Sequence, residues 1–113
     1  MHELGILMGV VETVEKFAKK NGVTKIQTLV LQIGELSSTI PKYIEDCYPA
    51  AVAGTLLQET ELKIEILPGN AICQSCGKVF NLIANHDACP GCGSGDWEIL
   101  CGKEFMIKEI VAC

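Results

Sequence analysis

The chain has 113 residues, 49% of them hydrophobic, and a formal net charge of −5. This length suits one ordinary domain or two small ones, and the apolar content is enough for a packed core, which excludes wholesale disorder. The acidic balance argues against a nucleic-acid-binding protein, because such proteins normally present a basic surface. There is no run of 18 apolar residues and no basic-then-apolar leader, so we expect no membrane span and no secretory signal, and predict a cytoplasmic protein.

Residues 4–20 have the spacing of an amphipathic helix. Apolar residues recur every three or four positions, which places them on one face. These residues are Leu4, Leu7, Val11, Val14 and Ala18, with Val10 and Phe17 beside them. Glu3 lies at the positive end of the helix dipole, and lysines fill the last turns, where cations are favoured. Asn21-Gly22 then predicts a left-handed stop.

A strand and a second helix are expected next. The segment TKIQTLVLQIG at 24–34 is rich in β-branched and aliphatic residues, which predicts a strand buried on both faces for part of its length. In SSTIPK, a Ser or Thr cap with Pro41 near the first helical position predicts a helix start. Its apolar stripe consists of Ile44, Cys47, Tyr48 and Ala51. Pro49 predicts a kink or an early end, because an interior proline removes a backbone donor and clashes with the preceding turn.

The segment ELKIEIL at 61–67 alternates charged and apolar residues, which is typical of a half-buried strand. Leu62, Ile64 and Ile66 are expected to face a core. PGN at 68–70 ends this strand and marks a change in composition. Beyond the cysteine-rich region, DWEILC and KEFMIKEIV predict two further strands on either side of Gly102.

The order of these elements predicts an α+β fold. Two helices pack on a small three-stranded sheet if the last strand returns to the sheet of the first two. A zinc-ribbon-like four-cysteine module is then inserted into that sheet domain. We therefore expect residues 1–68 with 102–113 to form the α+β domain, and residues 69–101 to form the inserted module.

Seven cysteines in so short a chain need a chemical explanation. The odd number disfavours a closed disulfide framework, and cytoplasmic proteins more often use cysteine for metal or redox chemistry. Cys47 lies on the stripe of the second helix, and both Cys47 and Cys101 are expected to be ordinary buried thiols. Cys113 is expected to be an exposed thiol at the chain end.

Two CxxC pairs, Cys73/Cys76 and Cys89/Cys92, lie twelve residues apart. Each pair can direct two sulfurs to one point, and the glycine that follows permits the tight backbone path. Four thiolates on a hairpin are typical of a tetrahedral Zn²⁺ site. A thiol oxidoreductase would place one pair at a helix N-terminus in a βαβ setting, which neither pair has. His86, between the pairs, is either an alternative ligand or a surface residue, and four cysteines favour the surface.

A closed site of four thiolates has no open position for water or substrate. We therefore predict that the zinc is structural and stabilises a module that is too small to form a hydrophobic core of its own.

The chain opens with MHEL, and His2 is one of only two histidines. A solvated histidine at a frayed end is an ordinary alternative to a ligand. However, the α-amine of Met1 and the amide nitrogen of His2 lie within chelate reach of the same imidazole, and Glu3 can supply a fourth donor. An in-plane nitrogen set suits Ni²⁺ or Cu²⁺. The residues alone leave both interpretations open.

The ordered set of motifs resembles the HypA/HybF family of hydrogenase maturation nickel metallochaperones. MHEL, LQIGELS, PGNAICQSCGKVF, CPGCGS and GKEFMIKEI are similar to family segments in order and spacing, from Met1 to Val111. The resemblance implies that His2 is a nickel ligand, working with the Met1 amine and the adjacent Glu3. It also implies that the four paired cysteines are ligands of a structural zinc.

The same resemblance implies a function and a set of partners. The protein would carry Ni²⁺ as transferred cargo, with Zn²⁺ as a structural ion, and would not be an enzyme. Its expected partners are a hydrogenase maturation GTPase and the hydrogenase large subunit, with urease maturation proteins as a further candidate. No nucleic-acid or membrane partner is expected, and monomer and homodimer both stay open. The alternative function is a zinc-ribbon module for protein interaction or regulation.

Overall fold

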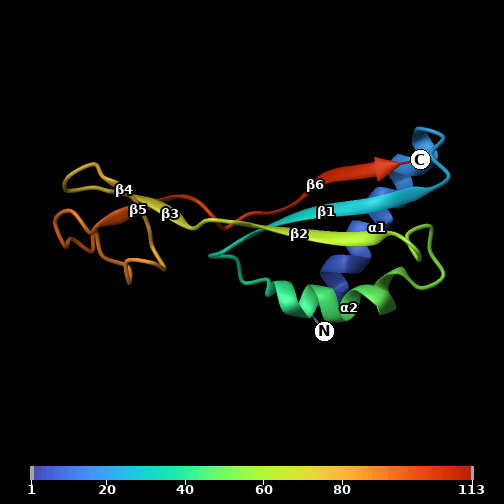
Figure 1. The fold of residues 1–113 in the computed structure, drawn as a ribbon, viewed down its shortest axis with the longest axis horizontal. Coiled ribbons are helices and arrows are strands. Elements are labelled where there is room, and N and C mark those ends of the chain that lie inside the picture. The colour runs from blue at the N-terminus through green and yellow to red at the C-terminus, as the bar shows by residue number, and fades with distance from the viewer. Residues whose placement is uncertain (1, 113) are drawn as a thin grey trace. The chain divides into compact units, whose positions relative to one another are not determined.

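The computed structural model describes residues 2–112, with the side chain of His2 left out (Figure 1). In chain order the elements are α1 (His2–Lys20), β1 (Ile26–Gly34), α2 (Pro41–Val52), β2 (Glu61–Leu67), β3 (Asn70–Cys73), β4 (Val79–Asn81), β5 (Trp97–Cys101) and β6 (Phe105–Ala112). The strands form two three-stranded sheets, ordered β2-β1-β6 and β4-β3-β5. The predicted α+β fold is thereby confirmed. Neither α1 nor α2 is long and apolar enough to cross a membrane.

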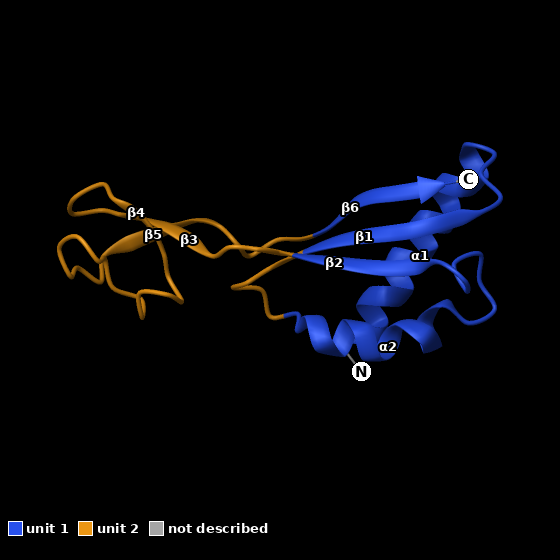
Figure 2. Ribbon diagram, viewed as in Figure 1, with its two compact units in different colours: residues 1–32, 39–65, 106–113 blue, residues 33–38, 66–105 orange. Residues whose placement is uncertain are grey.

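The chain divides into two compact units (Figure 2). Unit 1 comprises Met1–Gln32, Thr39–Glu65 and Met106–Cys113, and unit 2 comprises Ile33–Ser38 and Ile66–Phe105. Unit 2 therefore combines the cysteine-rich segment with a short segment from between β1 and α2. The assignment of functional domains to residues 1–68 with 102–113 and to residues 69–101 stays a prediction.

Helix α1 has the amphipathic pattern expected from its sequence. Leu7, Val14 and Ala18 are fully buried, and the helix packs against α2. Gly22 adopts a φ of +69°, and the N–H of Val23 donates to the carbonyl of Ala18 at 2.8 Å. This is the left-handed ending that Asn21-Gly22 predicts, in which glycine frees the chain to turn back on its last carbonyls.

Strand β1 lies at the centre of the unit 1 sheet, between β2 and β6. Its residues from Thr28 to Leu31 are all buried, so the strand is covered on both faces as predicted. Strand β2 has the predicted bounds, and Leu62 and Ile64 are partly buried. Ile66, expected in the core, is 50% exposed. Ile66 is the first residue of β2 that belongs to unit 2. The core of unit 1 covers the strand only up to the residues before it.

Helix α2 departs from its prediction at both ends. It begins at Pro41 as expected, but its N-cap is Ile40, without a side-chain cap from Ser or Thr. It also continues past Pro49 to Val52, so of the two outcomes predicted for this proline, a kink or an early end, the early end does not occur. Proline removes the N–H that would reach the carbonyl of Glu45, and its ring crowds the same carbonyl. Both Pro49 and Glu45 are exposed, so water can donate a hydrogen bond to that carbonyl. The buried face of the helix keeps its packing.

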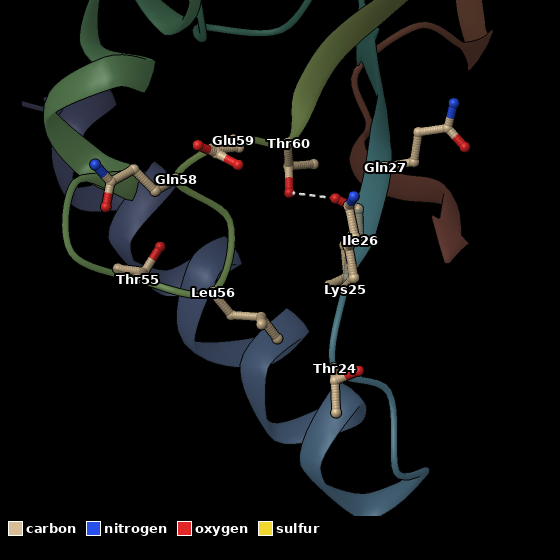
Figure 3. Close-up of a pocket in the computed structure, with 9 residues that line it drawn as sticks. All are labelled: Thr24, Lys25, Ile26, Gln27, Thr55, Leu56, Gln58, Glu59 and Thr60. Carbon is tan, nitrogen blue, oxygen red and sulfur yellow. Dashed lines mark hydrogen bonds between the residues drawn. The ribbon is translucent and has the colours of Figure 1, made fainter. Parts of the chain in front are cut away.

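Unit 1 contains a cleft of about 670 Å³ between the start of β1 and the loop before β2 (Figure 3). The residues lining it are Thr24, Lys25, Ile26, Gln27, Thr55, Leu56, Gln58, Glu59 and Thr60. The hydroxyl of Thr60 donates to the carbonyl of Ile26 at 2.8 Å and ties the two walls together. The lining offers no cysteine or histidine, so the cleft is poorly suited to bind a soft or borderline metal.

Candidate metal site

Two tight turns in unit 2 position the four cysteines of the CxxC pairs. Gly77 and Gly93 adopt φ values of +79° and +75°, which glycine reaches at little cost. Their N–H groups donate to the carbonyls of Cys73 and Cys89, at 2.9 and 2.7 Å. The glycine after each pair therefore closes the turn, as the sequence predicted.

The four cysteine sulfurs converge on one point. All lie within 4.8 Å of one another. The sulfurs of Cys73 and Cys92 are 3.5 Å apart, as are those of Cys76 and Cys89. A tetrahedron of sulfurs with Zn–S bonds of about 2.3 Å has edges of about 3.8 Å. Within the part of the chain that the structure describes, this is the one group of three or more histidine, cysteine or acidic side chains placed to hold a metal.

At two of the four sulfurs, hydrogen bonds from backbone N–H groups outweigh burial and favour the charged form. The N–H of Cys76 donates to Sγ of Cys73 at 3.4 Å, and this bond lowers the pKa of Cys73 to about 6. Burial raises the pKa of Cys89, but backbone hydrogen bonds from Cys92 and Gly91 outweigh burial and leave this pKa lowered. These two positions are thus prepared to act as thiolates.

The other two thiols respond in the opposite direction. A backbone hydrogen bond from Ser94 lowers the pKa of Cys92, but the thiol of Cys73 and burial raise it more, to about 12. A backbone hydrogen bond from Lys78 likewise lowers the pKa of Cys76, and its thiol neighbour and burial again leave it raised. Four thiols this close cannot all ionise by themselves. A dication at the centre removes the conflict, because it favours the thiolate at every position.

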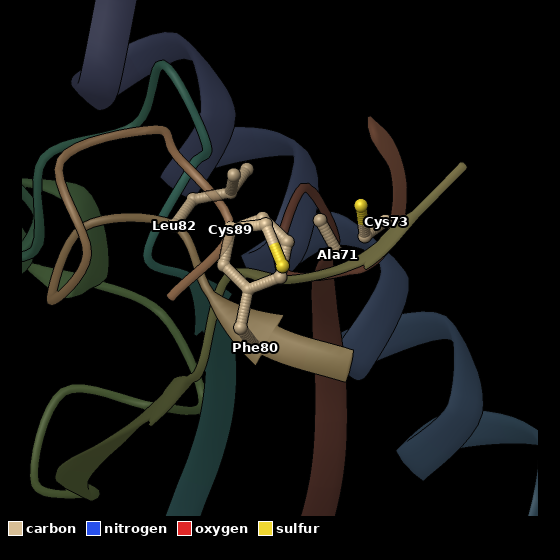
Figure 4. Close-up of a cluster of buried hydrophobic side chains, with 5 residues drawn as sticks. All are labelled: Ala71, Cys73, Phe80, Leu82 and Cys89. Atoms are coloured by element: carbon tan, nitrogen blue, oxygen red, sulfur yellow. The ribbon is translucent and has the colours of Figure 1, made fainter. Parts of the chain in front are cut away.

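The apolar cluster under the sulfurs is small (Figure 4). Its buried members are Ala71, Cys73, Phe80, Leu82 and Cys89, with Leu36, Trp97 and Ile99 packed against it. Two of the five buried residues are themselves members of the cysteine group. The donor set therefore fits a metal that stabilises a unit with little hydrophobic core of its own.

The remaining cysteines and His86 lie outside this group. His86 is exposed, as expected of a surface residue, and is not among the converging side chains. Cys47 is buried in α2, as predicted. Cys101 is only partly buried, with its sulfur 3.5 Å from the carbonyl of Pro68, so the prediction of a buried thiol is wrong for this residue. Cys113 lies outside the described residues.

Unit 2 also contains a polar contact that the sequence analysis missed. Oε1 of Glu35 accepts hydrogen bonds from the side-chain amide of Asn81 at 2.8 Å and from the N–H of Gly69 at 3.0 Å. In that order of importance, these bonds hold the pKa of Glu35 below its usual value. No local signal marks this contact, because its partners lie more than thirty positions away along the chain.

The N-terminal motif is only partly described. The backbone of α1 begins at His2, and Glu3 lies in its first turn with a partly exposed side chain. Met1 and the side chain of His2 lie outside the described residues. The terminal chelate of Met1, His2 and Glu3 therefore stays a prediction.

Comparison with known proteins adds independent information about the whole chain. A family model described as hydrogenase/urease nickel incorporation, metallochaperone, hypA matches residues 1–112. A hydrogenase maturation factor HypA of Geobacter metallireducens is 40% identical over 110 residues, which cover 97% of each chain. Hydrogenase maturation factor HypA 2 of Bradyrhizobium diazoefficiens is 32% identical with the same coverage.

Solved structures agree with the fold. A solution structure of a HypA protein matches with a TM-score of 0.72 and 25% identity, covering 100% of this chain and 97% of the other. The solution structure of the Ni metallochaperone HypA from Helicobacter pylori matches with a TM-score of 0.68 and 23% identity, covering 97% and 96%. At that identity, the second match supports the fold alone.

Proposed function

This chain belongs to the HypA family of nickel incorporation metallochaperones, and from this premise we propose that it binds Ni²⁺ at its N-terminus and delivers it for maturation of nickel–iron hydrogenase. The observation that carries the proposal is the family match over residues 1–112, which includes the MHEL start as well as both CxxC pairs. The action is binding and transfer of a metal ion rather than catalysis.

The proposed nickel site uses the start of α1. The first four N–H groups of a helix have no intrahelical acceptor, so the amides of His2 and Glu3 are free of such bonds. The positive end of the helix dipole disfavours a dication. Deprotonation of an amide on binding, together with the carboxylate of Glu3, offsets this penalty. With the imidazole of His2 and the amine of Met1, the donors form the in-plane nitrogen-rich set that Ni²⁺ prefers.

We further propose that Cys73, Cys76, Cys89 and Cys92 hold a structural Zn²⁺. The convergence of their sulfurs and the opposed pKa shifts of the four thiols support this assignment. All four coordination positions are filled by protein, so the ion stabilises unit 2 and offers no open position to a substrate.

Delivery requires release of the metal to a partner. The proposed partners are a hydrogenase maturation GTPase and the hydrogenase large subunit in the cytoplasm, with urease maturation proteins as a further candidate. Imidazole must be neutral to bind a metal, so Ni²⁺ is expected to leave as the pH falls through the range in which histidine takes up a proton. Zn²⁺ in its thiolate cage should remain bound over most of that range.

Nickel titration of the purified protein tests the terminal site. His2→Ala should abolish the tight nickel site, and so should an extension of several residues ahead of Met1, because the terminal amine then leaves chelate reach. Zinc content should stay unchanged in both variants. His86→Ala is the matched control, because His86 is the other histidine and is exposed in unit 2. The proposal fails if the two terminal variants bind nickel as the parent does, or if His86→Ala removes the site.

A further inference from the structure

The four-cysteine group offers a second set of donors for nickel within the carrier proposed above. Thiolates bind both metals, and the general affinity order does not favour Zn²⁺ over Ni²⁺. Geometry separates the two ions, because structural zinc sites are tetrahedral whereas Ni²⁺ with strong donors prefers a square plane. Exclusion of nickel from the cysteines therefore depends on how firmly the backbone holds the sulfurs in a tetrahedron.

The carboxylate of Glu35 closes one end of the hairpin that carries the first CxxC pair. Its Oε1 accepts from Gly69, which precedes β3, and from Asn81, which ends β4. The N–H of Leu82 also donates to the carbonyl of Gly69 at 2.9 Å. Strands β3 and β4 pair from Asn70 opposite Asn81 toward the turn with the cysteines. We call this set of contacts between Glu35, Gly69 and Asn81 the clamp. Asn70, beside it, and Cys73 are three positions apart in β3, or about 10 Å along the strand at a rise of about 3.3 Å per residue.

Glu35 is itself fixed by its backbone. Its N–H donates to the carbonyl of Leu67 at 2.8 Å, and the next N–H, of Leu36, donates to the carbonyl of Gly102 at 2.7 Å. The side chain of Leu36 packs against the cluster under the sulfurs and against Gly69, where an added Cβ would collide with it. The backbone therefore holds Glu35 beside the hairpin, so its carboxylate loses little conformational freedom when it accepts the two hydrogen bonds.

The orientation of the Asn81 amide is set by a second contact. Its Oδ1 accepts the N–H of Ala84 at 2.9 Å, so its Nδ2 is the group that faces Glu35. This Nδ2 also lies 3.3 Å from Oδ1 of Asn70 in the neighbouring strand. One acidic side chain from residues 33–38 therefore joins both strands of the hairpin.

We propose that Glu35 is a positioning residue for metal selectivity: by clamping the β3–β4 hairpin it keeps the four thiolates tetrahedral and keeps cargo nickel out of the zinc site. This inference rests on the proposed function, in which nickel is the cargo and zinc the resident ion. Direct hydrogen-bond partners of metal ligands change metal affinity by about 10–100-fold when removed, and Glu35 acts on the ligands through the hairpin, so we expect the lower end of this range.

The test measures replacement of zinc by nickel at the cysteines. Zinc-loaded protein carrying His2→Ala is mixed with excess Ni²⁺, and both the release of zinc to a coloured chelator and the charge-transfer absorption of nickel–thiolate bonds are followed. The His2→Ala background removes the proposed terminal site, so a failure of the proposed function leaves this assay unaffected. Adding Glu35→Ala should speed zinc release by about 10-fold and produce the absorption band.

Matched variants separate positioning from general stability. Glu65→Ala is the control, because the Glu65 carboxylate also accepts two side-chain hydrogen bonds, from Gln32 and Lys108, but lies in unit 1. Asn81→Asp should act like Glu35→Ala, because it places two carboxylates together. Glu35→Gln should keep exchange slow, since its amide oxygen can accept the same two hydrogen bonds, from Asn81 and from the N–H of Gly69.

Three results would overturn the proposal. The first is an unchanged exchange rate in Glu35→Ala, and the second is equally fast exchange in Glu65→Ala. The third is slow, parent-like exchange in Asn81→Asp, which remains decisive even if Glu35→Ala does not fold.

Discussion

The two units of this protein are stabilised in different ways. Unit 1 has a core of fully buried aliphatic side chains, which include Leu7, Val14, Leu29, Leu31, Ile44 and Leu57. Burial of each contributes about 1.5–3 kcal/mol, so this core can hold two helices on a sheet by itself. Unit 2 has five buried residues in its cluster, two of them cysteines of the metal group. The comparison teaches that one chain can combine a unit with a large aliphatic core and a unit whose few buried residues include cysteines placed to hold a metal.

Each unit also has its own optical probe. Trp97 is the single tryptophan, and it lies in unit 2, where its Nε1 donates to the carbonyl of Asp87 at 2.9 Å. The two tyrosines, Tyr43 and Tyr48, both lie in α2 of unit 1. Fluorescence of the tryptophan therefore follows unit 2, while helical circular dichroism follows unit 1.

Removal of the metal should have the largest effect and should separate the units. Structural zinc contributes about 10–16 kcal/mol of apparent folding free energy in small zinc modules. We expect a strong chelator, or Cys73→Ala, to unfold unit 2 and shift the Trp97 emission while the helical signal of unit 1 persists. Restoring zinc after chelation should reverse the change. An unchanged tryptophan signal in metal-free protein would mean that unit 2 has enough core of its own.

A cavity in the core of unit 1 should have an intermediate effect on stability. It should destabilise unit 1 and leave unit 2 unchanged, which is the reverse of metal removal. Leu29 in β1 is fully buried, so Leu29→Ala should lower the free energy of unfolding of unit 1 by about 2–5 kcal/mol, measured by urea and circular dichroism. Zinc content should not change. Leu100→Ala is the control in β5, where the side chain is 54% exposed, with an expected change within about 0.5 kcal/mol. Loss of zinc from Leu29→Ala would contradict the independence of the two units.

The smallest effect should come from one buried hydroxyl in unit 1. The hydroxyl of Tyr48 donates to the carbonyl of Thr60 at 3.0 Å. Tyr48→Phe should therefore lower the free energy of unfolding of unit 1 by about 1 kcal/mol and leave that of unit 2 unchanged. Tyr43→Phe, at a site 52% exposed, is the control with no expected change.

The same hydroxyl predicts a pH dependence. Burial raises the pKa of Tyr48 to about 12, whereas an unfolded tyrosine titrates near 10.0. The unfolded state therefore loses its proton first, so this contribution to stability is complete below about pH 10 and is lost as the pH rises toward 12. Urea titrations of parent and Tyr48→Phe over this range should differ in slope. Parallel curves would show that Tyr48 does not carry the effect.

Local patterns predicted most of the fold and the cysteine group. The three-and-four spacing of α1, the aliphatic run of β1 and the glycine after each CxxC pair act over a few residues, so sequence alone could reveal them. The missed features depend on surroundings. Helix α2 continues through Pro49 because its buried face compensates for a lost backbone bond on the exposed face. Ile66 is exposed because the core of unit 1 ends before it.

The sequence by itself determined the chemistry of this protein. The types and spacing of Cys73, Cys76, Cys89 and Cys92 select a four-thiolate site, because donor identity is a local property of side chains. Only the tertiary structure decided what surrounds those donors. It brings Glu35 against Gly69 and Asn81, because both strands that flank the module pair with β1 and draw residues 33–38 into unit 2. Contacts across such separations depend on strand pairing, which no local pattern in one sequence encodes.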